Sequence, residues 1–147
     1  MLKNRSVPAE AILPHVTYDD LDRAIEWLSK TFGFAEHYRY GQPVSGAQMF
    51  LGRAWIMVST ARTDRGSPAR VGICTQSLTV FVDDVASHFE RARTAGCSVV
   101  EELHETVYGE RQYAVMDIEG HHWLFSQHVR DVDPTEWGAA VATRPSC

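Results

Sequence analysis

The chain has 147 residues, of which 44% are hydrophobic and 22% are charged, and its formal net charge is −5. This composition is typical of one ordinary globular domain, or of two very small modules that share a core. It excludes a disordered or fibrous protein, and an acidic balance without a tight basic cluster argues against a nucleic-acid partner. No run approaches the roughly 18 apolar residues that a membrane span needs, so we expect no membrane partner.

The three cysteines are odd in number and widely spaced, at Cys74, Cys97 and Cys147. Such spacing is typical neither of a disulfide framework nor of a zinc-binding motif, and it fits free thiols in a reducing compartment. The basic N-terminal residues are followed by no apolar stretch of signal-peptide length. We therefore expect a cytoplasmic protein.

The first half of the chain predicts one strand, one helix and three further strands. Residues 11–18 form the first strand, which Pro14 places at a sheet edge or a bulge. Asp19 and Asp20 provide an N-cap for a helix whose single apolar stripe must lie against a sheet, and Gly33 ends that helix. The three following strands are predicted at residues 34–41, 47–52 and 55–60.

The same order of elements is predicted again after a loop at residues 63–75, which is rich in charged and turn-forming residues. A strand at residues 77–82 precedes Asp83 and Asp84, which cap a second amphipathic helix that Gly96 closes. The strands that follow are predicted at residues 98–103, 111–116 and 121–127, and a short helix at 134–141.

The repeated order indicates an internal duplication. Asp20 aligns with Asp84 at an offset of 64 residues, and Trp55 aligns with Trp123 at an offset of 68. We therefore predict an α+β fold of paired βαβββ modules, each a four-stranded curved sheet with a helix on its convex face. The predicted boundaries are 10–62 for the first module, 63–75 for the linker loop, 76–129 for the second module and 130–147 for the C-terminal tail.

Each predicted sheet leaves a concave face that no helix covers. These faces enclose a cleft either within one chain or between two chains, and a cleft of this kind is where a small molecule would bind.

Three stretches resemble the vicinal oxygen chelate superfamily, which groups glyoxalase I, extradiol dioxygenases, fosfomycin-resistance enzymes and bleomycin-resistance proteins. They are residues 16–34 (VTYDDLDRAIEWLSKTFGF), 80–96 (VFVDDVASHFERARTAG) and 108–125 (YGERQYAVMDIEGHHWLF). The resemblance covers roughly residues 10–129 in the family's order. It implies the glyoxalase/bleomycin-resistance/dihydroxybiphenyl dioxygenase fold, on which both metalloenzymes and metal-free binders are built.

The resemblance also implies where catalytic members of the family would hold a metal ion. One ligand normally lies on the first strand of each module, seven residues before the helix-capping Asp, and another lies on the last strand. The corresponding residues here are Leu13, Ser77, Leu124 and, through the tryptophan alignment, Ile56. Leucine and isoleucine offer no lone pair, and a serine hydroxyl is a poor ligand. The chain therefore resembles a metal-lacking, bleomycin-resistance-like branch.

A displaced metal site stays open as an alternative. His15 and His122 lie two positions from two of these residues, on the same strand faces, and His37 or Glu110 could complete a site with them. We nevertheless predict no metal and no other cofactor. A lone strand histidine is more often a hydrogen-bonded wall residue, and several ligands would have to move together.

Two other features have both a structural and a functional interpretation. Trp55, Trp123 and Phe125 are predicted on the face opposite the expected ligand positions, which favours packing under the helices over stacking on a ligand. Arg111 could clamp a carboxylate or phosphate through its fork geometry, but a structural pair with Glu110 that anchors a loop is the favoured interpretation.

The predicted function is metal-independent binding of a small molecule, a drug or metabolite, in the cleft of a homodimer, as the resemblance to antibiotic-resistance proteins implies. The alternatives are a metal-dependent lyase, isomerase or dioxygenase with displaced ligands, and a protein with a vestigial site that acts only by dimerising. Whether the chain is an enzyme stays open, and no catalytic residue is assigned. The predicted cleft residues are Leu13, His15, Ile56, Ser77, Arg111, Tyr113, His122 and Leu124.

Overall fold

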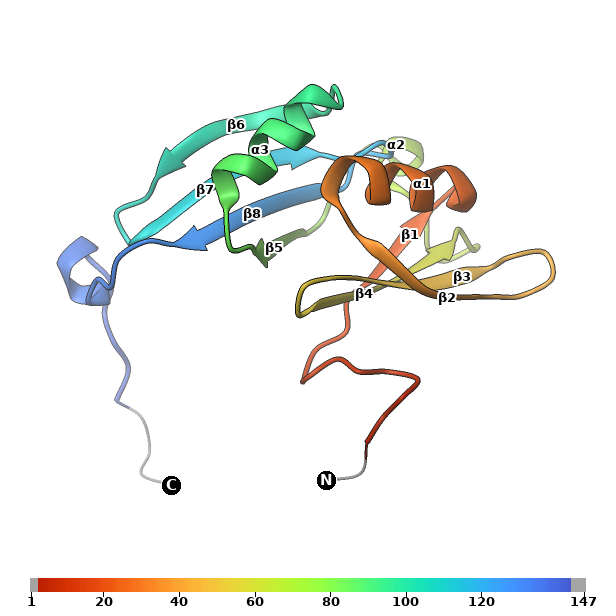
Figure 1. The fold of residues 1–147 in the computed structure, drawn as a ribbon, viewed down its shortest axis with the longest axis horizontal. Coiled ribbons are helices and arrows are strands. Elements are labelled where there is room, and N and C mark those ends of the chain that lie inside the picture. Colours follow the sequence, from red (N-terminus) through yellow and green to blue (C-terminus); the bar gives the residue numbers. More distant parts are fainter. Residues whose placement is uncertain (1–2, 144–147) are drawn as a thin grey trace.

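The computed structural model describes residues 3–143 as two four-stranded sheets with helices on one side (Figure 1). The first module contains β1 (His15–Tyr18), α1 (Leu21–Phe32), β2 (Ala35–Tyr40), β3 (Gly46–Leu51) and β4 (Ala54–Thr60). The second contains β5 (Ser77–Phe81), α3 (Val85–Thr94), β6 (Ser98–Glu105), β7 (Glu110–Met116) and β8 (His122–His128). This arrangement confirms the predicted α+β fold of paired βαβββ modules.

The two sheets have the same topology. Their strand orders are β1-β4-β3-β2 and β5-β8-β7-β6, with the first and last strand of each module parallel and all other neighbours antiparallel. A parallel pair needs a long crossover, which the helix and two intervening strands provide in each module. No helix among residues 3–143 is long and apolar enough to cross a bilayer.

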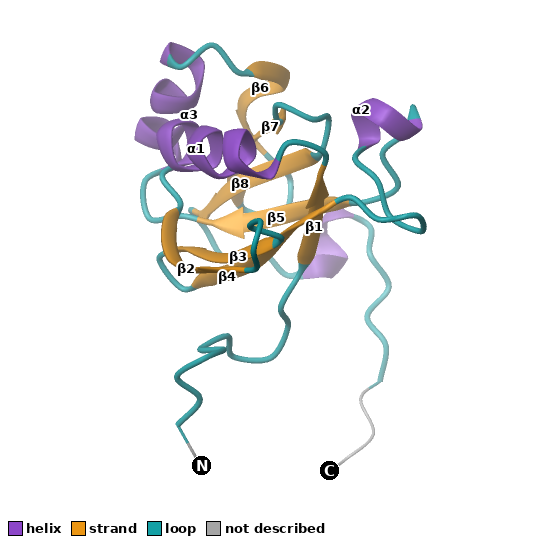
Figure 2. Cartoon of the chain, turned by 90° about the vertical axis from the view of Figure 1, so that its right-hand side faces the viewer, coloured by secondary structure: helices purple, strands orange, loops and turns teal. Residues whose placement is uncertain are grey.

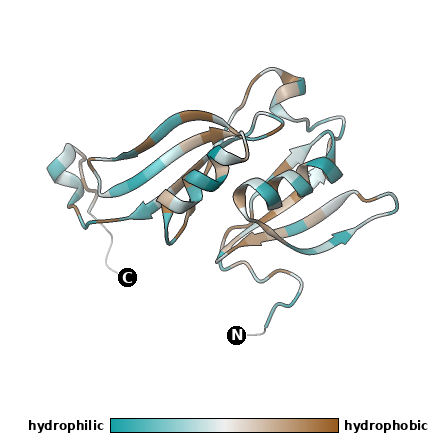
Figure 3. Cartoon of the chain, turned by 45° about the horizontal axis from the view of Figure 1, so that its top comes forward, coloured by the Kyte–Doolittle hydropathy of each residue, from teal (hydrophilic) through white to brown (hydrophobic). Residues whose placement is uncertain are grey.

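Both long helices begin at the predicted caps. The Asp20 carboxylate accepts a hydrogen bond from the Arg23 backbone N–H, and Asp84 does the same for Ser87. Gly33 ends α1 with a left-handed φ of 84°, a conformation that glycine adopts without a steric cost. Figure 3 shows hydrophilic residues interspersed along both helices, as expected where one stripe is buried and the other face is exposed.

The two modules share one hydrophobic core beneath their helices. Helices α1 and α3 lie side by side over the sheets (Figures 1 and 2). Phe32, at the end of α1, contacts two aromatic rings of β8, with centroid distances of 4.7 Å to Phe125 and 5.6 Å to Trp123. Both β8 residues are completely buried. The prediction that they pack under the helices is therefore correct.

A buried carboxylate at the turn before β8 also joins the modules. Asp117 is 6% exposed and accepts hydrogen bonds from the Tyr18 hydroxyl at 2.6 Å and from the Trp123 indole N–H at 3.0 Å. Glu119, in the same turn, accepts from the Asp20 backbone N–H at the start of α1. The turn of the second module thus holds both the first strand and the first helix of the other module.

Three details differ from the sequence predictions. The first strand begins at His15, not at residue 11, and the linker contains a short helix, α2 (Pro68–Val71). The tail forms only a 3₁₀ helix, η1 (Pro134–Trp137), in place of the helix predicted at 134–141. Cys74 and Cys97 are free thiols, and Cys147 lies outside the described residues.

Candidate functional site

The faces of the two sheets that point away from the helices form the concave side of the molecule. Side chains alternate between the two faces of each strand, so the buried, helix-facing residues identify their concave neighbours. Concave residues of the first module include His15, Thr17, Gln48, Phe50, Trp55, Met57 and Ser59. Those of the second include Ser77, Thr79, Phe81, Glu110, Gln112, Ala114, Met116, His122, Leu124, Ser126 and His128.

The alignment of Trp55 with Trp123 is wrong by one residue. Trp55 stacks on Phe50 of the concave face at 4.7 Å, whereas Ile56 is 2% exposed and belongs to the core. Strand pairing gives the correct equivalence. Met57 is paired with His15 of β1, and Leu124 is paired with Thr79, the equivalent residue of β5. Met57 therefore takes the concave position predicted for Ile56, which belongs to the core and also contributes to the wall of a cavity between the modules.

Tyr113 and Arg111 are also incorrect cleft predictions. Tyr113 is completely buried, and its hydroxyl lies 2.5 Å from Nδ1 of His88 on α3, so it faces the helix. Burial and the neighbouring thiol of Cys97 raise the pKa of the Tyr113 hydroxyl. Arg111 lies two positions away on the same face of β7, where its guanidinium donates to Glu105 at 2.8 Å. The structural ion pair of Arg111 is therefore formed with Glu105 instead of Glu110.

The other predicted residues fall on or beside the concave side. Ser77 and His122 are direct neighbours on paired strands, and Leu124 is paired with Thr79 on the same face. His15 lies on the concave face of β1, and Leu13 precedes that strand and is partly buried.

The donor set at the expected metal positions does not fit a divalent ion. With the corrected register these positions hold Leu13, Met57, Ser77 and Leu124, a set of two hydrocarbon side chains, one thioether and one hydroxyl. Within residues 3–143, no group of three or more His, Cys, Asp or Glu side chains is arranged to hold a metal ion.

An aromatic platform covers the concave face of the first module. Besides the Phe50–Trp55 stack, the His37 ring meets Trp55 edge-on at 5.4 Å. The completely buried Gln48 amide fixes this arrangement, because its Oε1 lies 2.7 Å from His37 Nδ1 and its Nε2 donates to the Met57 sulfur at 3.4 Å. We define this platform as His37, Gln48, Phe50, Trp55 and Met57. The prediction that Trp55 packs under the helices is therefore wrong, because the register error assigned this tryptophan to the opposite face of β4.

One end of the matching face of the second module, where β7 begins and β8 ends, is polar. His128 Nδ1 lies 3.1 Å from a carboxylate oxygen of Glu110, and the Gln112 amide oxygen accepts from the Tyr108 hydroxyl at 3.3 Å. Gln112 and Ser126 are 7% and 1% exposed, and they are paired directly across β7 and β8. The sequence predictions gave Glu110 as a possible metal ligand and as a structural partner of Arg111, and they did not include Gln112 or Ser126.

Cavities lie where the modules meet. One, of about 330 Å³, has mainly apolar walls from the segment before β1 and from β4 and β5. Its lining includes Ile12, Pro14, Trp55, Ile56, Leu78 and Val80. This volume is at the lower end of the range for small-molecule sites.

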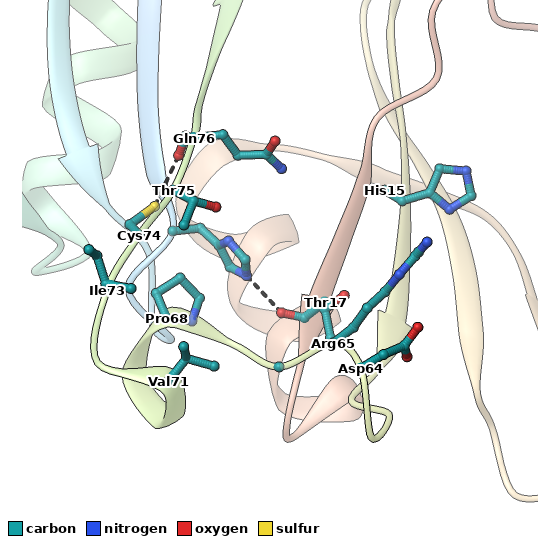
Figure 4. Close-up of a pocket in the computed structure, with 12 residues that line it drawn as sticks. His15, Thr17, Asp64, Arg65, Pro68, Val71, Ile73, Cys74, Thr75 and Gln76 are labelled. Atoms are coloured by element: carbon teal, nitrogen blue, oxygen red, sulfur yellow. Dashed lines mark hydrogen bonds between the residues drawn. The ribbon is translucent and has the colours of Figure 1, made fainter.

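Another cavity is more polar and has a volume of about 600 Å³. The linker forms much of its wall. Thr75 and Gln76 lie on one side of the cavity, and Arg65 lies on the other beside Thr17 of β1 (Figure 4). The ring of His121 closes one side through a 2.7 Å hydrogen bond between Nε2 and the Thr17 carbonyl oxygen. The linker, predicted only as a surface loop, is therefore part of the concave side.

Comparison with known proteins agrees with this geometry. Residues 12–125 match the family model described as Glyoxalase/Bleomycin resistance protein/Dioxygenase superfamily. The chain belongs to this superfamily. It is 30% identical over 142 residues to the protein Mb0911c of Mycobacterium bovis, and the match covers 91% of this chain and 93% of that protein.

Solved structures of the superfamily share the fold. TioX from Micromonospora sp. ML1 superimposes with a TM-score of 0.69 at 31% identity, over 82% of this chain and all of TioX. The fosfomycin resistance protein FosX from Listeria monocytogenes gives a TM-score of 0.61 at 14% identity, over 81% of this chain and 93% of FosX. The likeness to FosX concerns the fold alone.

Proposed function

We propose that the protein binds a planar, partly apolar small molecule, a drug or metabolite, on its concave side without the help of a metal ion. One observation carries this proposal: a preorganised aromatic platform lies beside expected metal positions that hold no suitable donor set.

The platform supplies affinity in two ways. Trp55 is partly exposed, so a flat ligand that stacks on its ring would exclude water from both surfaces, and each aromatic pair contributes about 0.5–1.5 kcal/mol beyond area burial. The Gln48 amide already fixes the His37 ring, so little side-chain freedom is lost on binding. The neighbouring apolar cavity between β4 and β5 would receive a small substituent of the same ligand.

We further propose that the chain works as a cytoplasmic homodimer. Ile12 is 81% exposed and Phe81 is 63% exposed, and both lie on or beside the concave side. A second copy would cover these apolar groups and turn the open concave faces into enclosed clefts. Light scattering during gel filtration should give the mass of two chains, and a monomer at micromolar concentration would contradict the dimer.

Binding can be tested with a neutral aromatic probe, 1-naphthylmethanol, added to ¹⁵N-labelled protein. We expect the indole N–H signal of Trp55 to shift on titration, and Trp55→Ala to weaken binding at least about tenfold. Trp137→Ala is the matched control, because this exposed tryptophan of the tail contacts Tyr108, between β6 and β7, and not the platform. An unchanged Trp55 signal at saturating probe, or equal losses in both variants, would contradict the proposal.

A further inference from the structure

We propose that the concave face of the second module contains a recognition site for a cationic group, an ammonium or guanidinium, on the ligand. This inference rests on the proposed binding function and adds the chemical class of the ligand. The site consists of Glu110, Gln112, Ser126 and His128, which we call the acidic block.

The acidic block is built by the register of β7 and β8. Glu110 lies directly opposite His128, and Gln112 lies directly opposite Ser126, so the four side chains occupy neighbouring positions on one face. Phe81 of β5 flanks the block at Ser126. The block is therefore fixed by the pairing of two neighbouring strands, β7 and β8, and does not depend on a loop.

Two oxygen atoms of the block have unused hydrogen-bonding capacity. Oε2 of Glu110 and Oγ of Ser126 are both buried, and neither has a hydrogen-bond partner among residues 3–143. Buried polar atoms in folded proteins almost always have a partner, because leaving one unpaired costs free energy. A pair of unused acceptors at diagonal positions of two paired strands fits a ligand group that donates more than one hydrogen bond.

The ligand group that donates to these two oxygens should also carry a positive charge. No Lys or Arg side chain of the described residues forms an ion pair with Glu110, whose only ionic neighbour is His128, at 3.1 Å. That imidazole is charged only when protonated. A buried carboxylate oxygen without a donor is costly, and an incoming ammonium or guanidinium removes this cost through charge-assisted hydrogen bonds.

His128 is the residue of the block whose side chain has room to rotate. Its side chain is 56% exposed, whereas that of Glu110 is 16% exposed. Rotation of the imidazole toward solvent opens Glu110 to the concave side, and the ligand cation then takes the place of the histidine.

The first module has no equivalent of the acidic block. Strand pairing makes Ser59 the counterpart of Ser126, but Ser59 lies opposite Gly46, where the second module has Gln112. The ring of Tyr40 lies so close to Gly46 that a β-carbon there would overlap it. A cation therefore has one preferred place on the concave side, which orients the ligand.

The test compares two probes of nearly the same shape, 1-naphthylmethylamine and 1-naphthylmethanol, by calorimetry at pH 7.5. We expect the amine to bind the unmodified protein at least about tenfold more tightly than the alcohol. Glu110→Gln should abolish this preference and Ser126→Ala should reduce it. Glu102→Gln, an exposed residue of β6, changes the net charge equally and should leave the preference intact.

Equal binding of both probes to the unmodified protein would overturn the cation site and leave the proposed binding function standing. A preference that persists in Glu110→Gln would also overturn it, because general attraction to the acidic protein, or an ordered water at the two oxygens, would then suffice. Failure of both probes to bind would overturn the proposed function itself. If Glu110→Gln does not fold, the comparison of probes on the unmodified protein and on Ser126→Ala decides.

Discussion

The two modules are alike on their helix-facing sides and differ on their concave sides. Under the helices, Val16 and Val80 occupy equivalent buried positions, as do Ile56 and Trp123. On the concave side, the first module presents the aromatic platform and the second presents the acidic block. Packing against a helix restricts the first set to apolar residues that fill the available volume, whereas concave positions are free to differ and therefore to determine ligand chemistry.

Paired tryptophan variants should give the largest contrast between these two sides. Trp123→Ala removes a completely buried ring between Phe32, Phe34 and Asp117, and should lower the free energy of unfolding by about 3–5 kcal/mol. Trp55→Ala removes a partly exposed ring and should cost about 1 kcal/mol. Urea unfolding followed by circular dichroism measures both, and similar losses in the two variants would contradict the assigned faces.

The next largest effect should come from the carboxylate that joins the two modules. Asp117→Ala leaves the Tyr18 hydroxyl and the Trp123 indole N–H buried without an acceptor, and should lower the free energy of unfolding by about 3 kcal/mol. Burial and the negative charge of Asp117 raise the pKa of Tyr18, so this hydroxyl remains a donor. Tyr18→Phe removes one of these hydrogen bonds and should cost about 1 kcal/mol. Equal losses would show that the network does not act through Asp117.

The smallest effect should be a pH dependence that arises between the helices. His88 on α3 makes hydrogen-bond contacts with the Phe32 carbonyl oxygen at 2.8 Å and the Tyr113 hydroxyl at 2.5 Å. Burial, together with the charge of Arg91, lowers the pKa of His88, although the Phe32 carbonyl opposes the shift. The unfolded chain therefore binds this proton at higher pH than the folded protein does. The stabilising contribution of neutral His88 is complete above about pH 6.5 and is lost as the pH falls toward the lower folded pKa.

Melting temperatures at pH 7.5 and 5.5 measure this effect. We expect a lower melting temperature at pH 5.5, and a smaller difference in His88→Gln, which cannot take up the proton. An equal pH difference in the two proteins would assign the effect to other groups.

The sequence was sufficient to predict the fold because caps and apolar stripes are local signals. Asp20, Asp84 and Gly33 place the ends of the helices, and each helix requires a sheet beneath it. The faces of β4 were not predicted because side-chain direction reverses with every residue, so an alignment error of one position exchanges the two faces. Matching Trp55 with Trp123 by residue type produced this error.

The acidic block and the cavity wall formed by the linker depend on contacts between segments that are distant in the sequence. Local sequence patterns do not predict such contacts. Ser126 can be assigned to the acidic block only once its pairing with Gln112 across β7 and β8 is known. His121 becomes part of a cavity wall only through its hydrogen bond to Thr17, 104 residues away in the chain.

The central claim, that the concave side binds its ligand without a metal ion, can be tested on chelator-treated protein. Metal content is measured by elemental analysis, and affinity for 1-naphthylmethanol is measured before and after addition of Zn²⁺ or Mn²⁺. The predicted result is the same affinity in every sample, with less than stoichiometric metal in the purified protein. Stoichiometric metal in the protein as purified, with binding or turnover that disappears on chelation and returns with the ion, would contradict the claim.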